Sequence, residues 1–378
     1  MESKKKIGIF ALCSKADGGV YQYTISILDA LSNDYSNDYI LYVADDRLFS
    51  NYRFEKRVVP VINRGFQKYF NYLALFFNVN FFFNKNTFLY KDLHFIISTN
   101  TTFSPIYFLG IPYIYTLHDL QEEYYPNFFS RKDLWLRRLI NRRMSHKSLM
   151  IICESNAVKC DIVRFHKVEA SKIQVLPSPA SSNFNSLIFS DELKIQVRNK
   201  YNLPDKYIFY PAQSWQHKNH LNLLRAFKLI AKDFDNLKLV FSGGKTSYYS
   251  IIQNEIDVLN LKGNVIHLGY IDEFDFPYVY KMSEFLVMPS LFESISIPVI
   301  EAFSLQIPVC ASNFESIQEQ IGSCGLCFNP NDPVDISEKM IAYLSDENLK
   351  CRFALAGYEK SRSFDYDSYR AQLISCFK

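Results

Sequence analysis

Two glutamates late in the chain, Glu293 and Glu301, have seven residues between them, across what reads as a strand end, a tight loop and a helix start. Pro298 suits the first position of that helix, because a proline lacks the N–H that would have no partner there. The free N–H groups of Ser296 and Ile297 would face whatever lies in front of the helix, and such a terminus attracts phosphate. Carboxylates on either side of a diphosphate can accept hydrogen bonds from sugar hydroxyls, so the spacing predicts a nucleotide-sugar site. A buried helix with two incidental glutamates is the alternative, which the neighbouring motifs disfavour.

The residues around the glutamates resemble a family signature. The chain reads Pro289-Ser-Leu-Phe-Glu-Ser-Ile-Ser-Ile-Pro-Val-Ile-Glu301 and continues to Ile307-Pro-Val-Cys-Ala-Ser312. This segment resembles the signature of glycosyltransferase family 4, whose members are retaining, metal-independent enzymes with two facing Rossmann-like domains and an interdomain cleft (the GT-B architecture). The family usually has Glu-Gly-Phe-Gly where this chain has Glu-Ser-Ile-Ser. If the loop needs a positive φ at Ser294, the serine costs on the order of 1 kcal/mol.

The wider pattern alternates short apolar strands with amphipathic helices, in two runs with a break between them. Strands that alternate with helices of this length indicate parallel sheets, so we predict an α/β protein with two doubly wound domains. The predicted domains are residues 1–185 and 205–361, with a linker at 186–204 and a C-terminal helix, 362–378, that rejoins the first domain. The predicted strands are Ile7–Leu12, Tyr39–Val43, Arg57–Ile62, Phe95–Ser98, Tyr113–Leu117, Leu149–Cys153, Ile208–Pro211, Leu237–Ser242, Val265–Leu268, Phe285–Met288 and Val309–Ala311.

Ligands of open parallel sheets bind beyond the carboxyl ends of the strands, and two motifs of the first domain follow predicted strands. Gly18 and Gly19 would let the backbone approach a diphosphate closely, and they open a Gly-Gly-Val-x-x-Tyr sequence that resembles the family's. His118 stands in Thr-Leu-His-Asp, again close to a family motif. The resemblance implies that this histidine contacts the donor sugar near the reacting carbon. Asp119 is the residue expected to orient its ring.

The second domain supplies a cation in the same kind of position. Lys218 lies in Pro-Ala-Gln-Ser-Trp-Gln-His-Lys-Asn-His, which resembles a subgroup containing many mannosyl- and rhamnosyl-type transferases. A lysine here would neutralise charge on the diphosphate leaving group, and losing one such donor typically costs about 3–4 kcal/mol. Most of the family has a second cation five or six residues earlier, where this chain has Ala212 and Gln213. Asn219 is expected to be the N-cap of the next helix.

Two further strand ends resemble the family's nucleotide site, Ser242-Gly-Gly-Lys245 and Leu268-Gly-Tyr270. The resemblance implies that the second of these holds the nucleobase. We therefore assign Gln213, Gly243 and Tyr270 to binding of the donor nucleotide, together with the glycines and the helix-start residues named above.

No metal or other cofactor is expected. The two Asp-x-Asp sequences, at 233–235 and 365–367, lie at the wrong end of a sheet and at a helix cap. Cys324 and Cys327 form a C-x-x-C without a second pair at zinc spacing, so we interpret them as buried core thiols.

Charge is distributed unevenly along the chain. The net charge is +3, but residues 51–150 hold 14 Lys/Arg against 6 Asp/Glu. A basic first half suits an anionic acceptor or an acidic membrane surface better than nucleic acid. Within it, an aromatic stripe at 66–83 is expected to be domain core, with a membrane-surface helix as the alternative. The apolar stretch after Lys6 is at the lower length limit for a secretory signal, and no small-residue cleavage site follows it. We therefore expect a cytoplasmic protein, with peripheral contact at the inner face of the cell membrane as an option.

These observations together predict retaining transfer of a hexose or 6-deoxyhexose, of mannose or rhamnose type, from a nucleotide-diphosphate donor to a glycan acceptor that could be lipid-linked. His118, Glu293 and Lys218 are the predicted catalytic residues, and Glu301 would bind the ribose. The departing phosphate oxygen would take the acceptor proton, as the resemblance implies. Two alternatives are a nucleotide-sugar epimerase of the same architecture and a catalytically silent partner subunit.

Overall fold

A computed structural model describes residues 4–59, 66–79, 87–180, 184 and 189–377. The chain divides into two compact units, each treated by itself below. Unit 1 comprises Met1–Ser178 and Tyr366–Lys378, and unit 2 comprises Pro179–Asp365. None of the helices in the described part of the chain is long and apolar enough to cross a membrane.

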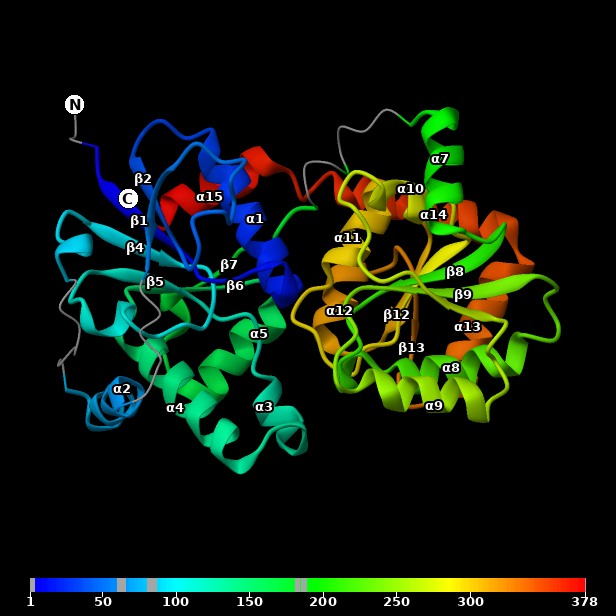
Figure 1. The fold of residues 1–378 in the computed structure, drawn as a ribbon, viewed down its shortest axis with the longest axis horizontal. Coiled ribbons are helices and arrows are strands. Elements are labelled where there is room, and N and C mark those ends of the chain that lie inside the picture. Colours follow the sequence, from blue (N-terminus) through cyan, green and yellow to red (C-terminus); the bar gives the residue numbers. More distant parts are fainter. Residues whose placement is uncertain (1–3, 60–65, 80–86, 181–183, 185–188, 378) are drawn as a thin grey trace. The chain divides into compact units, whose positions relative to one another are not determined.

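Unit 1 is built on a seven-stranded parallel sheet with the strand order β3-β2-β1-β4-β5-β6-β7 (Figure 1). The strands are β1 (Lys6–Ala11), β2 (Asp38–Val43), β3 (Glu55–Val58), β4 (Phe95–Ser98), β5 (Tyr113–Thr116), β6 (Met150–Cys153) and β7 (Ile173–Val175). Its α-helices are α1 (Gly19–Ser32), α2 (Phe66–Phe77), α3 (Gln121–Tyr124), α4 (Arg131–Lys147), α5 (Asn156–Asp161) and α15 (Tyr366–Ser375). The order reverses direction after β1, so β1 and β4 flank the switch point where doubly wound sheets bind ligands.

Alternate residues of the central strands enter two different cores. On β1, Phe10 belongs to one apolar cluster, whereas Ile7 and Ile9 belong to another. Successive side chains of a strand point to opposite faces, so the two clusters cover the two faces of the sheet. The last helix, α15, packs on α1 and adds Tyr369 and Leu373 to the second cluster.

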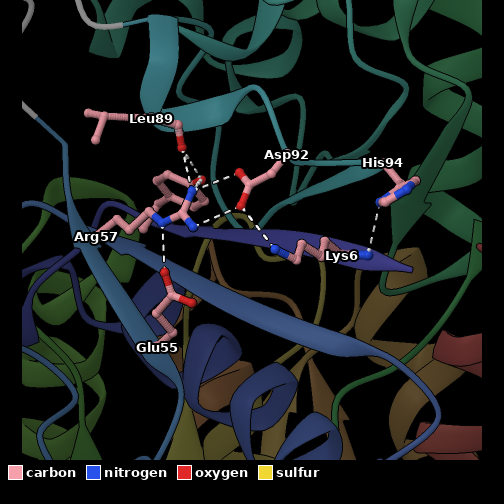
Figure 2. A network of polar contacts seen from close by, with 7 residues as sticks. Lys6, Glu55, Arg57, Leu89, Asp92 and His94 are labelled. Atoms are coloured by element: carbon pink, nitrogen blue, oxygen red, sulfur yellow. Dashed lines mark hydrogen bonds and ion pairs between the residues drawn. The ribbon is translucent and has the colours of Figure 1, made fainter. Parts of the chain in front are cut away.

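A network of ion pairs and hydrogen bonds lies at the β3 edge of this sheet. Arg57 on β3 binds both carboxylate oxygens of Asp92 and also Glu55, while its Nη1 donates to the Leu89 carbonyl (Figure 2). Lys6 on β1 reaches the same Asp92 at 3.3 Å. The network ties the edge strand to the segment that leads into β4, and charges on an edge strand discourage pairing with another sheet.

Unit 2 contains a six-stranded parallel sheet with the strand order β10-β9-β8-β11-β12-β13 (Figure 1). The strands are β8 (Lys206–Pro211), β9 (Leu237–Ser242), β10 (Val265–His267), β11 (Phe285–Met288), β12 (Val309–Ser312) and β13 (Leu326–Phe328). The helices are α7 (Asp191–Tyr201), α8 (His220–Ile230), α9 (Tyr249–Val258), α10 (Phe276–Lys281), α11 (Ile297–Ser304), α12 (Glu315–Ile321), α13 (Pro333–Ser345) and α14 (Glu347–Ser361). Its switch point lies between β8 and β11, the strands that precede Lys218 and Glu293.

The predicted fold class, two doubly wound α/β domains, is confirmed. The predicted strands did not include β7, which has three residues. The strand predicted from Arg57 begins earlier, at Glu55, and residues 60–62 lie outside the described part. The predicted linker, 186–204, contains helix α7, because Ser190 caps an amphipathic segment there.

Two expectations about buried side chains are wrong. Most of the aromatic stripe on α2 is exposed, since the helix buries its opposite side through Asn71 and Leu75. Residues 80–83 of the predicted stripe lie outside the described part. Cys324 and Cys327 are only half-buried against the core of unit 2.

Candidate functional site

The centre of the site in unit 2 is an ion pair between two loops. Lys218 ends a short 3-10 helix after β8, and its Nζ lies 2.6 Å from Oε1 of Glu293. Ser290 donates a hydrogen bond to the same oxygen. The Glu293 side chain is 7% exposed and that of Lys218 is 23% exposed. Neither Lys218 Nζ nor Glu293 Oε2 has another partner among the described residues, so both groups keep hydrogen-bonding capacity for a ligand.

The two loops are held together by main-chain carbonyls as well. Asn219 adopts a left-handed conformation (φ 59°), and its Nδ2 donates to the carbonyls of Pro289 and Pro330. The N–H of Leu291 donates to the His217 carbonyl at 2.7 Å. Asn219 does occupy the N-cap position of α8, as predicted, but its side chain joins loops and does not cap the helix. The position of Lys218 against Glu293 is therefore fixed by buried hydrogen bonds.

The start of α11 differs from the prediction in three respects. The Ser296 N–H is not free, because it donates to Oε1 of Gln320, whose Nε2 donates back to the Ser296 carbonyl. Pro298 is the second residue of the helix and not the first. Ser294 does not adopt a positive φ, so a serine in place of the family's glycine is not strained. The Ile297 N–H has no partner in the described part of the chain and remains the one main-chain donor of the predicted pair.

Glu301 lies inside the first turns of α11 and is 4% exposed. Its Oε2 accepts a hydrogen bond from the Tyr280 hydroxyl at 2.8 Å. Burial raises the pKa of this carboxyl to about 7, although the Tyr280 hydrogen bond acts in the opposite direction. Oε1 has no partner among the described residues, so one oxygen remains for the ribose hydroxyls that the prediction assigns to it.

The residues assigned to the nucleotide lie together at the carboxyl ends of β8, β9 and β10. Gln213 Nε2 donates to the Tyr270 hydroxyl at 3.2 Å. A Cβ added to Gly243, whose φ is +108°, would lie 2.9 Å from the backbone of Ala212, so this position requires glycine. A Cβ on Gly244 would lie 2.5 Å from the Tyr270 hydroxyl. The Tyr270 side chain is exposed and offers a ring face to a base.

In unit 1 the ring of His118 is held at both nitrogens. Nδ1 lies 3.2 Å from Oε2 of Glu154, and Nε2 lies 3.1 Å from the Thr99 carbonyl. The ring of Tyr23 packs edge-on against it. Asp119 was expected to orient the ring, and that expectation is wrong: the Asp119 carboxylate accepts from the Gln121 N–H instead.

Two acceptors favour an imidazolium that donates from both nitrogens. Burial by itself lowers the pKa of His118, but the hydrogen bond with Glu154 and its charge outweigh burial, so the pKa lies above its usual value. A doubly protonated ring cannot remove a proton from an acceptor hydroxyl. Because Glu154 and Thr99 already engage both ring nitrogens, His118 is suited to electrostatic stabilisation and not to general base catalysis.

The predicted glycines open α1. Gly18 has φ 57° and ψ −115°, which glycine adopts far more readily than other residues. A Cβ added to Gly19 would meet no atom within 4 Å, so the space beside this residue is open. The close approach of Gly19 to a diphosphate remains a prediction.

Four polar residues of these sites were not identified from the sequence. Thr99 follows β4 directly, Glu154 follows β6 directly, and Ser290 comes two residues after β11. The strand-end rule that selected His118 would have selected these three as well. Gln320 could not be selected by this rule, because it lies near the C-terminal end of helix α12 and does not follow a strand.

Replacing Glu154 by Gln should lower the pKa of His118, because the main group that favours the imidazolium is removed while burial persists. The measurement is an NMR titration of the imidazole signals, assigned through a His118→Gln variant. Asp119→Asn is the matched control and should have a smaller effect. An equal decrease in both variants would contradict the assignment of Glu154 as the orienting residue.

Replacing Glu301 by Gln should stabilise unit 2 at alkaline pH but not at acidic pH. The pKa of Glu301 is about 7 in the folded protein and 4.5 in the reference state. As pH rises, the unfolded chain therefore loses the carboxyl proton first, and the stability of the wild type falls between these two pH values. The stability difference between variant and wild type should grow by about 2–3 kcal/mol from pH 5 to pH 8. Urea unfolding in a Trp135→Phe background, where Trp215 is the only tryptophan, reports on unit 2. A difference that does not change with pH would refute the shifted pKa.

Comparisons with known proteins agree with this architecture. Residues 18–182 match the family model described as Glycosyltransferase Family 4, and residues 191–360 match that of Glycosyl transferases group 1. The chain is 26% identical over 269 residues to O-antigen chain mannosyltransferase B of Escherichia coli, a match that covers 70% of this chain and 69% of the relative. It is 30% identical over 220 residues to O-antigen chain mannosyltransferase RfbU of Salmonella typhimurium, with 57% of this chain and 56% of the relative covered.

Among solved structures, Anabaena Alr3699/HepE in complex with UDP and glucose superposes with a TM-score of 0.78. The superposition covers 98% of both chains at 16% identity, so it supports the fold alone. The two family models together account for most of the sequence. This chain is a glycosyltransferase of family 4 with the GT-B fold.

Proposed function

We propose that the protein transfers a mannose-type hexose from a nucleoside-diphosphate sugar to a hydroxyl of a glycan, with retention of anomeric configuration and without a metal ion. The relatives reported above are named as O-antigen chain mannosyltransferases, which supports both the sugar and a role in polysaccharide synthesis. A solved structure of similar fold holds UDP-glucose, which supports a nucleotide-sugar donor. A lipid-linked glycan is the acceptor we favour.

The Lys218–Glu293 pair is the observation on which the proposal depends. A lysine ammonium has three protons, and only one is used in the pair, so two remain for diphosphate oxygens. Oε2 of Glu293 is available for a sugar hydroxyl. A cation and a carboxylate 2.6 Å apart therefore present complementary groups to the two halves of one donor, the diphosphate and the sugar.

The remaining donor contacts follow from positions around this pair. Gln213, Gly243 and Tyr270 would receive the nucleobase, Glu301 the ribose, and the Ile297 N–H a phosphate oxygen. Where many family members have an arginine, Gln213 bonds to Tyr270, so the diphosphate would be neutralised by one side-chain cation in this unit. The proposed role of Gly19 is close approach to the diphosphate.

The reaction itself exchanges one bond at the anomeric carbon. The bond from that carbon to the diphosphate oxygen breaks, and the bond to the acceptor oxygen forms. The acceptor proton passes to the departing phosphate oxygen, and Lys218 stabilises the charge that remains on the diphosphate. The proposed role of His118, as an imidazolium, is contact with the donor sugar and not proton removal.

The experiment starts with a thermal-shift panel of GDP-mannose, dTDP-rhamnose and UDP-glucose and continues with turnover on a membrane glycolipid fraction. Lys218→Met should reduce turnover by about 100-fold or more, because a preorganised charge on the leaving group is lost. Turnover is measured as nucleoside diphosphate release together with the NMR coupling constant of the new anomeric proton.

A double variant separates chemistry from folding. Lys218→Met alone leaves the buried Glu293 carboxylate unpaired and should lower the melting temperature. Lys218→Met/Glu293→Gln should recover stability without recovering turnover, and Lys232→Met, on an exposed segment after α8, should change neither. Inverted product, or an epimer formed from donor without acceptor, would overturn the proposal.

A further inference from the structure

Unit 1 exposes an aromatic surface on α2 that the proposed function does not use. Five apolar side chains of this helix, between 41% and 66% exposed, form what we name the aromatic face: Tyr69, Phe70, Leu73, Phe76 and Phe77. Trp135 on α4, 51% exposed, lies beside it, with its ring 5.9 Å from that of Phe76. Large contiguous apolar surface on a soluble domain marks a place of interaction.

The neighbouring helix α4 is strongly basic, in contrast to the apolar aromatic face of α2. It contains seven Lys/Arg and a single acidic residue, Asp133. Arg137 and Arg138 are neutralised by Glu122 and Glu123. In contrast, Arg142 and Arg143 have no acidic partner among the described residues. The charge at the C-terminal end of this helix is therefore uncompensated.

Two cavities open at that uncompensated end. One, of about 400 Å³, is lined by Leu139, Arg142, Arg143 and His146. The other, of about 350 Å³, shares Arg143 and His146 and adds Asn78, Tyr107 and Lys147. We name these two together the basic pocket. Guanidinium groups bind phosphate in a bidentate manner, and each cavity is large enough for a phosphate-bearing headgroup.

The pocket and the aromatic face belong to one surface. Nη2 of Arg143, which lines both cavities, donates to the backbone carbonyl of Phe76 at 2.8 Å. The helices α2 and α4 pack on each other, and Figure 1 shows them side by side within unit 1. Exposed aromatic rings therefore lie next to cations that face an open cavity.

We propose that this α2–α4 surface docks on an anionic phospholipid bilayer, with a lipid phosphate in the basic pocket and the rings of the aromatic face inserted among the acyl chains. Aromatic and basic side chains together are the combination that interfacial helices use, because apolar burial and attraction to anionic lipid add. An acidic protein partner would satisfy the cations but would give no specific reason for so many exposed rings on one helix. The inference does not depend on the proposed sugar transfer, since it concerns binding alone.

The test is flotation of the full-length protein with vesicles of phosphatidylcholine, with and without phosphatidylglycerol. Wild type should float with the anionic vesicles, and more weakly at high salt. Phe77→Ser should lower the affinity by roughly 10-fold, through lost apolar burial. Arg142→Glu should lower it by at least about 5-fold, through lost attraction to the headgroups.

Matched controls carry the same changes on unit 2. Phe274→Ser alters an equally exposed phenylalanine, and Lys232→Glu alters an exposed cation, and neither should affect flotation. All four altered side chains lie at the surface, and circular dichroism verifies their folding. Equal flotation with neutral vesicles, equal loss in the controls, or no flotation of wild type would overturn the proposal. If the wild type does not bind vesicles but is a dimer, and Phe77→Ser converts that dimer into a monomer, the aromatic face serves self-association instead.

Discussion

The short contact between Lys218 and Glu293 is the constraint around which unit 2 is organised. A carboxylate with this little exposure is stable as an anion only where a cation and hydrogen bonds compensate it, and here Lys218 and Ser290 supply both. The pair requires the loops after β8 and β11 to meet. The bond from Asn219 to the Pro289 carbonyl enforces that meeting without using either charged group, and a second bond, to the Pro330 carbonyl, adds the loop after β13. A pair held in this manner is preorganised for a ligand with a negative end and a hydroxyl-bearing end.

The rest of the unit follows from the geometry of parallel sheets. The strands β8, β9, β10 and β11 direct their carboxyl ends to one edge, so residues distant in sequence gather there. Because residue 243 is a glycine, the chain can pass close to the backbone of Ala212. The next residue, Gly244, lies against the Tyr270 hydroxyl. In unit 1 the same rule brings Thr99, His118 and Glu154 together from the ends of β4, β5 and β6.

Much of this was predictable because strand ends are visible in the sequence. The alternation of strands and helices predicted the two-domain fold. Strand ends together with the family resemblance selected His118 and Lys218, whereas Glu293 was selected by its spacing to Glu301 and by the signature around it. Partners could not be read in the same way. Asp119 is adjacent to His118 in sequence, yet Glu154 holds the ring, because neighbouring strands in space need not be close along the chain. Gln320 accepts the hydrogen bond of the Ser296 N–H from a separate helix, and no feature of the sequence indicates that contact. The stripe on α2 has the spacing of a core helix, and spacing alone does not tell which faces of a helix find a partner.

In the proposed site, Glu293 binds the sugar of the donor while Lys218 binds its diphosphate. Calorimetric titration of Glu293→Gln and wild type, with the preferred nucleotide-sugar and with its nucleoside diphosphate, tests this division most directly. The account predicts that the substitution weakens binding of the nucleotide-sugar by roughly 10-fold or more, as expected for a lost hydrogen bond to a charged group, while the nucleoside diphosphate binds nearly as before. Equal weakening of both ligands, or no weakening of either, would contradict it.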